Sequence, residues 1–235
     1  MFTRTLKRLL LAASMICLVA TANAAPIDDA NSFHMRGDYT QALKLYKRLA
    51  AQKNVPAQTM LGWMYGGGQG VTQDYPEALK WYRLAVSQGD AIAQNNLGSL
   101  YQNGLGVKQD YREALKLFQL SAAKGYAMAQ YNLGALYQNG QGIGLNHKEA
   151  LKWYRLAAAQ GHVYAQNNLG VIYSDGQGVP RDNNHAHMWF NLASAAGYAD
   201  GAKNRDVTAQ RMTPQQIEKA QDMARKCQER NFKGC

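Results

Sequence analysis

Cysteine is scarce in this chain of 235 residues, which contains only three. Cys17 lies in an apolar stretch near the N-terminus, and the other two, Cys227 and Cys235, lie in the tail. Two thiols are too few for a structural zinc site, which takes four protein ligands, and we expect neither metal nor cofactor. In an exported protein an isolated nearby pair more often forms a disulfide, so a Cys227–Cys235 bond is predicted. Pairing of Cys235 with another chain is the alternative.

Long apolar runs are absent after residue 24, so no stable membrane span is expected there. The first 24 residues carry three basic residues, the apolar run LLLAASMICLVA and a small-x-small exit at Ala22-Asn23-Ala24. This layout predicts a secretory signal peptide cleaved after Ala24, and hence a periplasmic or secreted protein. A retained anchor would need a longer apolar run, and Ile16 fits poorly before a lipidated Cys17.

Clusters of basic residues are also missing, although the formal net charge is +10, with 26 basic and 16 acidic residues. Three of the basic residues belong to the N-terminal stretch, and the others are scattered along the chain. No Lys/Arg run of the kind that binds nucleic acid occurs. We therefore expect no nucleic-acid partner, and the charge serves solubility or affinity for anionic surfaces.

The sequence does contain an internal repeat. Segments that begin at Leu61, Leu97, Leu133 and Leu169 match one another at a constant offset of 36 residues, without insertion or deletion. The third reads LGALYQNGQGIGLNHKEALKWYRLAAAQG, and a partial copy, GDYTQALKLYKRLA, precedes the first. A fixed period of this size is typical of a stacked array of repeats.

Each repeat is predicted to form two helices. In the first full repeat, residues 57–65 carry apolar side chains at helical spacing, with Gly62 in the middle, where close approach of a neighbouring helix would explain a glycine. The second helix begins at a capping signal, Asp74 followed by Glu77, and ends at Gly89. Its predicted buried side consists of Ala78, Leu79, Trp81, Tyr82, Leu84 and Ala85. Trp153 and Trp189 share the repeat position of Trp81 and are predicted to pack in the core.

The glycine-rich stretch YGGGQGVTQDY, residues 65–75, resembles a phosphate-binding loop at first sight. A dinucleotide fold requires a strand before such a loop, and the spacing G-x-G-x-x-G is absent. Here the loop joins two predicted helices and recurs in every repeat. Its glycines are predicted to let the chain reverse direction.

The pattern LGxxYxxGxGVxxDYxxALKWYRxAAxxG resembles the Sel-1-like repeat, a relative of the tetratricopeptide repeat, in its exported bacterial form. The resemblance implies an all-α fold, a right-handed α-solenoid of antiparallel helix pairs with 36-residue repeats, and a role as a scaffold that binds proteins. The predicted organisation is a signal peptide at 1–24, an N-terminal half-repeat at 25–54, four repeats at 55–198, and a C-terminal capping helix with the disulfide at 199–235. Thr213 and Pro214 are predicted to start the capping helix.

The resemblance also suggests a binding surface. In tetratricopeptide repeats, first-helix residues three before the mid-helix glycine, then one and four after it, line the concave face. The corresponding residues here are Thr59, Asn95, Tyr131 and Asn167; Trp63, Ser99, Ala135 and Val171; and Gly66, Gln102, Gln138 and Ser174. Amides can bond an extended peptide backbone and aromatics supply contact area, so a protein or extended peptide partner is expected, with Trp63 and Tyr131 as anchors. The alternative is that these are ordinary surface residues.

Enzymatic readings of the sequence are weaker. Ser121-Ala-Ala-Lys124 has the S-x-x-K spacing of penicillin-recognising enzymes, but Ser121 occupies a position that is alanine in other repeats, and the K-T-G partner is missing. His185 and His187 point to different sides of a helix and cannot jointly hold a metal. We therefore expect a monomeric, non-enzymatic protein-binding scaffold. The alternatives are a penicillin-recognising hydrolase and an envelope-associated factor that binds anionic glycans or lipids.

Overall fold

The computed structural model describes residues 25–235, so the predicted signal peptide lies outside the described part of the chain. This part consists of twelve α-helices and contains no strand. The helices are α2 (Ala25–Met35), α3 (Tyr39–Ala51), α4 (Val55–Gly67), α5 (Tyr75–Ser87), α6 (Ala91–Asn103), α7 (Tyr111–Ala123), α8 (Ala127–Asn139), α9 (His147–Ala158), α10 (Val163–Asp175), α11 (Asn183–Ala195), α12 (Ala199–Ala209) and α13 (Pro214–Glu229).

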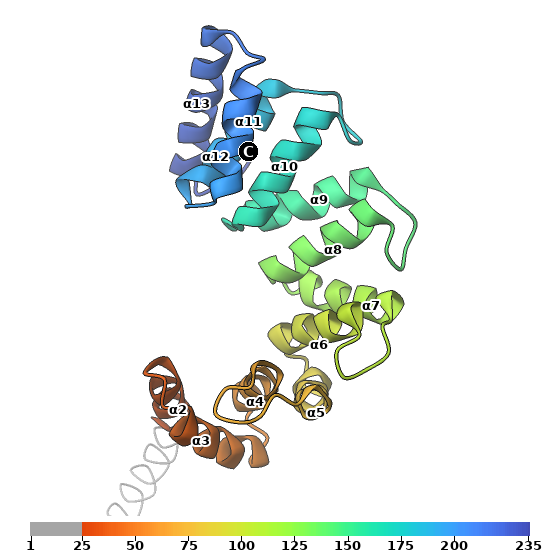
Figure 1. Ribbon diagram of the computed structural model, residues 1–235, viewed down its shortest axis with the longest axis vertical. Helices are drawn as coiled ribbons and strands as arrows, with labels where there is room; N and C mark the ends of the chain where they lie inside the picture. The colour runs from red at the N-terminus through yellow and green to blue at the C-terminus, as the bar shows by residue number, and fades with distance from the viewer. Residues whose placement is uncertain (1–24) are drawn as a thin grey trace, which may run out of the picture. The chain divides into compact units, whose positions relative to one another are not determined.

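The chain divides into two compact units. The first extends to Ala93 and includes residues 105–107, and the second comprises residues 94–104 and 108–235. In the first unit, α3 packs on α2 and α4, and α5 packs on α4. In the second, each helix from α7 to α11 packs on the next, as Figure 1 shows for the stack from α8 to α11. No helix among residues 25–235 has the length and apolar character needed to cross a membrane.

Second helices begin at the predicted caps. The Asp74 carboxylate accepts the backbone N–H of Glu77 at 2.9 Å, and the same bond recurs from Glu149 to Asn146 at 3.1 Å. The reciprocal half of the predicted capping box is absent at Glu77, whose carboxylate instead pairs with Lys80 at 2.7 Å. A complete box occurs at the start of α13, where Thr213 is the N-cap, as predicted.

The mid-helix glycines permit the close approach of the partner helix that the sequence predicted, and an aromatic ring of that helix fills the space. A Cβ built on Gly62 would lie 2.6 Å from the Tyr82 ring, and one on Gly134 would lie 2.8 Å from Tyr154. Such distances are far below van der Waals contact. Glycine is therefore required for packing at this position, despite its cost of about 1 kcal/mol within a helix.

The loop glycines have two functions. Gly140 adopts φ 66° and ends α8 in the left-handed conformation, which lets the chain reverse as predicted. Gly142, two residues later, lies against the start of α7 in the preceding repeat, where a Cβ would be 2.6 Å from the carbonyl oxygen of Tyr111. The second loop glycine therefore also permits close contact between repeats, which the sequence analysis did not anticipate.

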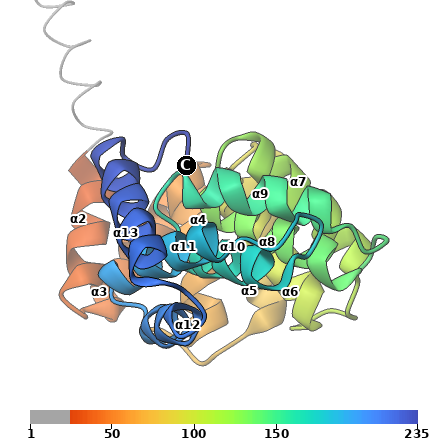
Figure 2. The ribbon, with the colours of Figure 1, turned by 90° about the horizontal axis from the view of Figure 1, so that it is seen from above.

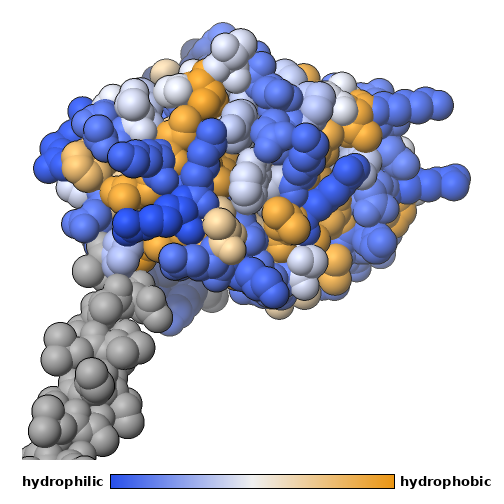
Figure 3. All heavy atoms as spheres, turned by 90° about the horizontal axis from the view of Figure 1, so that it is seen from below, coloured by the Kyte–Doolittle hydropathy of each residue, from blue (hydrophilic) through white to orange (hydrophobic). Residues whose placement is uncertain are grey.

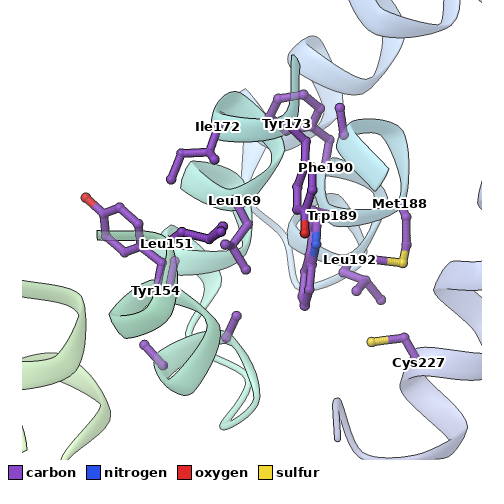
Figure 4. Packing of buried hydrophobic residues seen from close by; sticks show 14 of the residues in the cluster. Leu151, Tyr154, Leu169, Ile172, Tyr173, Met188, Trp189, Phe190, Leu192 and Cys227 are labelled. Carbon is purple, nitrogen blue, oxygen red and sulfur yellow. The ribbon is translucent and has the colours of Figure 1, made fainter. Parts of the chain in front are cut away.

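The core of each repeat is formed by the first-helix leucines and the inner side of the second helix. Figure 4 shows Leu169 and Ile172 of α10 packed with Trp189 and Phe190 of α11. Trp189 is 2 % exposed, as expected for the core, but Trp153 and Trp81 at the same repeat position are only half-buried. The prediction that Leu84 is buried was wrong, since it is 48 % exposed.

The exposure of Leu84 reflects a repeated outer position of the second helices. Leu120 and Leu156 stand at this position in the next two repeats and are 45 % and 43 % exposed, whereas Leu192 in α11 is 2 % exposed. Figures 1 and 2 show α12 and α13 beside α11, and both helices contact it. Helix α13 covers the last second helix and buries the outer leucine that earlier repeats leave in solvent.

Candidate functional site

Three of the predicted binding residues are buried instead of exposed. Thr59, Asn95 and Asn167 are 6 %, 3 % and 8 % exposed. The Asn132 side chain donates to the Asn95 amide oxygen at 2.9 Å, and Asn204 donates to Asn167 at 3.0 Å. These amides link neighbouring repeats, so they are not free to bond a peptide backbone, and the expectation that they line an open surface was wrong.

The polar residues at the other two predicted positions are half-buried: Ser99, Gln102, Gln138 and Ser174. Ser99 donates to the backbone oxygen of Asn95 at 3.1 Å, within its own helix. Gln138 accepts a bond from the Tyr154 hydroxyl at 2.8 Å and donates to Gln177 at 3.1 Å. The side chains of Ser99 and Gln138 are therefore already hydrogen-bonded inside the protein.

Trp63 is the exposed aromatic residue of the first unit. Its side chain is 42 % exposed and meets the His34 ring edge-on, with centroids 5.0 Å apart. His34 is itself held by a hydrogen bond to the Gln69 side chain at 2.9 Å. The indole thus has a fixed ring neighbour while 42 % of the residue remains in solvent, which is the arrangement expected of a contact residue.

A larger aromatic cluster lies in the second unit, and Tyr131 is part of it. The Tyr131 ring stacks on His162 at a centroid distance of 4.8 Å, and Tyr164 lies 6.1 Å from Tyr131. Tyr198 meets Tyr164 edge-on at 5.2 Å. We call Tyr131, His162, Tyr164 and Tyr198 the aromatic ladder. It runs from α8 across the start of α10 to the residue that precedes α12, and Tyr164 is 49 % exposed.

Tyr154 packs between the aromatic ladder and the hydrophobic core. Tyr154 is fully buried, and its ring lies 5.8 Å from Tyr131. Burial raises the pKa of both Tyr154 and Tyr131, and hydrogen bonding from the Asn168 side chain, which favours the phenolate, opposes this rise. Both phenols are therefore neutral near pH 7.

His162 contributes a neutral ring to the aromatic ladder. Burial lowers the pKa of its imidazole below the ordinary value of 6.5. Its Nδ1 accepts the backbone N–H of Ala165 at 3.3 Å and so caps α10, which requires an unprotonated Nδ1. The positive end of the helix dipole also disfavours a second charge there. Near neutral pH the His162 imidazole is therefore uncharged.

Of the ladder residues, only Tyr131 was predicted from the sequence, whereas His162, Tyr164 and Tyr198 were not. The sequence nevertheless contained a signal for them, because the residue type at their positions changes from one repeat to the next. Tyr164 corresponds to Ile92 and Met128, and His162 to Asp90. Structural positions recur in a repeat array, so a run of aromatic residues at variable positions indicates a surface with a separate use.

The sequence patterns that resembled a penicillin-recognising site and a metal site do not form such sites in the described residues. Ser121 is fully buried, as its place among packed alanines predicted, so a penicillin cannot reach its hydroxyl without unfolding of α7. His187 is 2 % exposed and packs at a leucine position, while His185 is half-buried and pairs with Asp182 at 2.7 Å. Within residues 25–235, no group of three or more potential metal-binding side chains occurs.

The two tail cysteines form a disulfide. Cys227 and Cys235 are bonded, with their Cα atoms 5.7 Å apart. Cys227 is 3 % exposed and belongs to the core cluster under α13, close to Leu192 in Figure 4. The bond therefore fixes the last residues of the chain to the capping helix.

Comparison with known proteins agrees with this architecture. The Sel1 repeat profile matches residues 32–54, 55–90, 91–126, 127–162 and 163–198. A search of curated protein sequences gave no significant match.

Several solved structures are similar. One is c5321, a protective antigen present in uropathogenic Escherichia coli strains displaying an SLR fold, with 36% identity and a TM-score of 0.76. The match covers 81% of this chain but 42% of that chain, so this chain spans less than half the length of c5321. A Sel1 repeat protein from Oxalobacter formigenes is 30% identical with a TM-score of 0.73, over 86% of this chain and 82% of that one.

A sel1 repeat protein from Klebsiella pneumoniae subsp. pneumoniae shares the fold at 22% identity, with a TM-score of 0.54 over 80% of this chain and 93% of that one. Sel1 repeat proteins are in general non-catalytic scaffolds for protein–protein interaction. The predicted fold class, a right-handed all-α solenoid of antiparallel helix pairs with 36-residue repeats, is confirmed by the helix pairing and by these neighbours. The chain therefore belongs to the Sel1 repeat family.

Proposed function

We propose that this chain is an exported scaffold that binds an extended segment of a partner protein through the aromatic ladder. The observation that carries the proposal is the ladder itself: four aromatic rings in successive contact, with Tyr164 half in solvent. Tyrosine offers large contact area with few rotatable bonds and a hydroxyl for hydrogen bonding, which is why it is enriched among interface hot spots.

The ladder is suited to a peptide because its rings form a continuous series with no Lys, Arg, Asp or Glu side chain among them. Its rings follow one another across two consecutive first-helix starts, so a segment in extended conformation can touch each in turn. Asp200 accepts the Tyr198 hydroxyl at 3.1 Å and gives one end of the ladder an acceptor. Trp63, in the first unit, is a second contact residue for the partner protein.

The proposal includes export, a monomeric chain and no nucleic-acid partner. Export is supported by the signal-like first 24 residues and by the Cys227–Cys235 disulfide, because such bonds persist in oxidising compartments. The scattered basic charge gives no patch for a phosphate backbone. Of the alternatives, a penicillin hydrolase would need the buried Ser121, and a factor for anionic surfaces would bind with steep salt dependence.

Site-specific photo-crosslinking tests the proposal. A benzophenone amino acid is placed at Tyr164 or, as a matched control, at Leu120, which is similarly exposed but lies on a second helix. We expect position 164 to capture a discrete partner from envelope extract and position 120 to capture none.

The captured protein then permits a quantitative test. Tyr164→Met introduces the residue found at the same position of the preceding repeat, Met128. The change therefore removes the aromatic ring and should leave the fold intact. It should weaken binding at least tenfold, about 1.4 kcal/mol, while Leu120→Ala leaves binding unchanged. Equal capture at both positions, or full affinity in Tyr164→Met, would show that the partner binds elsewhere.

A further inference from the structure

His162 makes two contacts that both depend on its protonation state. Its ring belongs to the aromatic ladder, stacked on Tyr131 at an interplanar angle of 25° and 5.9 Å from the Tyr164 ring. It is also the N-cap of α10, where its Nδ1 accepts the backbone N–H of Ala165 at 3.3 Å. A ring nitrogen can accept a hydrogen bond only while it carries no proton. One imidazole therefore couples the start of α10 to the ladder.

The other repeats show that this coupling is particular to His162. Asn54 and Asp90 occupy the same repeat position, and each accepts the corresponding backbone N–H, at 2.9 Å and 2.6 Å. Their amide and carboxylate oxygens remain acceptors between pH 5 and pH 8. Tyr126 and Tyr198 stand at this position without a side-chain cap bond. Among residues 25–235, His162 is thus the one cap of a first helix that mild acid can remove.

The groups around the His162 ring offer a proton no counter-charge. They come from α8, α9, α10 and the start of α12, and the titratable ones are Tyr131, Tyr154, Tyr164, Tyr198 and Asp200. Asp200 is the one carboxylate among them, and it accepts the Tyr198 hydroxyl at 3.1 Å. Burial is the cause of the lowered pKa of His162. The imidazole makes no ion pair within the described part of the chain, so an added proton would be unpaired.

Protonation would therefore disturb both contacts. An N–H at Nδ1 would face the Ala165 N–H, and the imidazolium would lie at the positive end of the α10 dipole. The ring relieves this by turning away from Ala165, which ends its stacking on Tyr131. Tyr164 lies in the first turn of the helix that loses its cap. A partner segment over the ladder would bury the imidazole further and so disfavour the proton still more.

We propose that the aromatic ladder is a pH-responsive site, which holds its partner segment at neutral pH and releases it in mild acid through protonation of His162. The inference rests on the proposed function and adds the condition under which the site releases its partner.

The sign of the effect follows from linkage. The bound segment reduces proton uptake by His162, so affinity decreases as the pH falls through the pKa of the free chain, which lies below 6.5. Because one proton is involved, the change is limited to about tenfold per pH unit.

NMR of the chain without a partner tests the response of the ladder itself. Between pH 8 and pH 5, the ring protons of His162 should titrate with a midpoint below 6.5, and the ring signals of Tyr131 and Tyr164 should move with the same midpoint. In His162→Asn, which keeps an acceptor at the cap, the tyrosine signals should not titrate in this range. Tyrosine signals that ignore the titration of His162 in the wild-type chain would overturn the proposal.

The partner captured at position 164 then permits affinity measurements at pH 7.5 and pH 5.0. The wild-type chain should bind it at least about threefold more weakly at pH 5.0. His162→Tyr introduces the residue found at the same position in Tyr126 and Tyr198, so it keeps a ring that does not titrate in this range. Whatever its affinity at pH 7.5, its affinities at the two pH values should be equal. His187→Leu, in α11 and outside the ladder, is the matched control and should keep the wild-type ratio.

Equal ratios in the wild-type chain and His162→Tyr would overturn the proposal. So would tighter binding in acid, which would mean that attraction of the imidazolium to the Tyr131 ring outweighs the lost cap. Circular dichroism at pH 5.0 separates release from unfolding. Capture of no partner at either pH would count against the proposed function, while the NMR titration still decides whether acid opens the ladder.

Discussion

At the residue scale, substitution of the mid-helix glycines distinguishes the effect of helix propensity on stability from the effect of side-chain packing. Gly134→Ala places a Cβ 2.8 Å from the buried Tyr154 ring, whereas Gly66→Ala, also in a helix, places it 3.7 Å from the Ala78 Cβ. Overpacking costs about 1–3 kcal/mol, against a helical gain of about 1 kcal/mol. In urea denaturation Gly134→Ala should therefore lose stability, and Gly66→Ala should gain up to about 1 kcal/mol. Stabilisation by both would show that the rings can move aside.

A second residue-scale prediction concerns His187, which replaces the leucine of the three preceding repeats. Burial lowers the pKa of its imidazole, Arg205 lowers it further, and Asp206 opposes this. The unfolded chain therefore takes up the proton first as the pH falls, so stability decreases as the pH passes below about 6.5. His187→Leu should reduce the fall in melting temperature between pH 7 and pH 5.

Part of that fall should remain in the variant, because burial also lowers the pKa of His162. His162→Asn, which keeps a side chain able to cap α10, is the complementary change. Identical pH profiles for the wild-type chain and His187→Leu would mean that the buried imidazole is not the group that titrates.

Individual residues were predictable where one helix decides their environment. Periodicity within a helix correctly placed Tyr82 in the core but failed for Leu84, because an apolar residue at the edge of the helical stripe can point inward or outward. The positions carried over from tetratricopeptide repeats were exposed at Trp63 but not at Asn95, which is covered by Asn132 from the next repeat. The exposure of such residues depends on neighbours that a single helix does not specify.

At the scale of elements, caps and turns made the helices predictable. Asp74 and Thr213 cap their helices as expected, and the left-handed glycines end the first helices. Helix α4 begins at Val55, two residues before the predicted start, because Asn54 caps it and Pro56 fits its first turn. The capping helix was expected from the Thr-Pro start, and it packs on α11, the second helix of the last repeat, as a cap of the array should.

The helices do not present one continuous apolar patch on the face of the protein shown in Figure 3. On the face shown in Figure 3, hydrophobic residues form short strips between hydrophilic ones. The aromatic ladder is distinguished by contact between its rings and not by total apolar area. Because its members come from α8, α10 and the connections before α10 and α12, no single element of the sequence contains it.

At the scale of the whole molecule, stability in a repeat array is carried by each repeat and its contacts with its neighbours. The described chain fits this view, because its contacts fall into two compact units, 25–93 with 105–107, and the remainder. The C-terminal unit ends at α13, which buries Leu192, while the N-terminal unit has its own core around Leu61 and Tyr46. Damage at one end should therefore remain local.

Leu192→Ala tests this locality. Because α13 covers Leu192, its truncation should cost about 2–5 kcal/mol, whereas Leu120→Ala at the same repeat position but exposed should change stability by less than about 0.5 kcal/mol. Hydrogen exchange followed by mass spectrometry should show faster exchange in α11 and α13 of Leu192→Ala, with α3 to α5 unchanged. Acceleration along the whole chain would mean that all repeats open together, and a large cost for Leu120→Ala would mean that its side chain is covered in solution. Unaltered exchange in the N-terminal unit is the result that a nearest-neighbour array requires, because each repeat is stabilised only by itself and by its adjacent repeats.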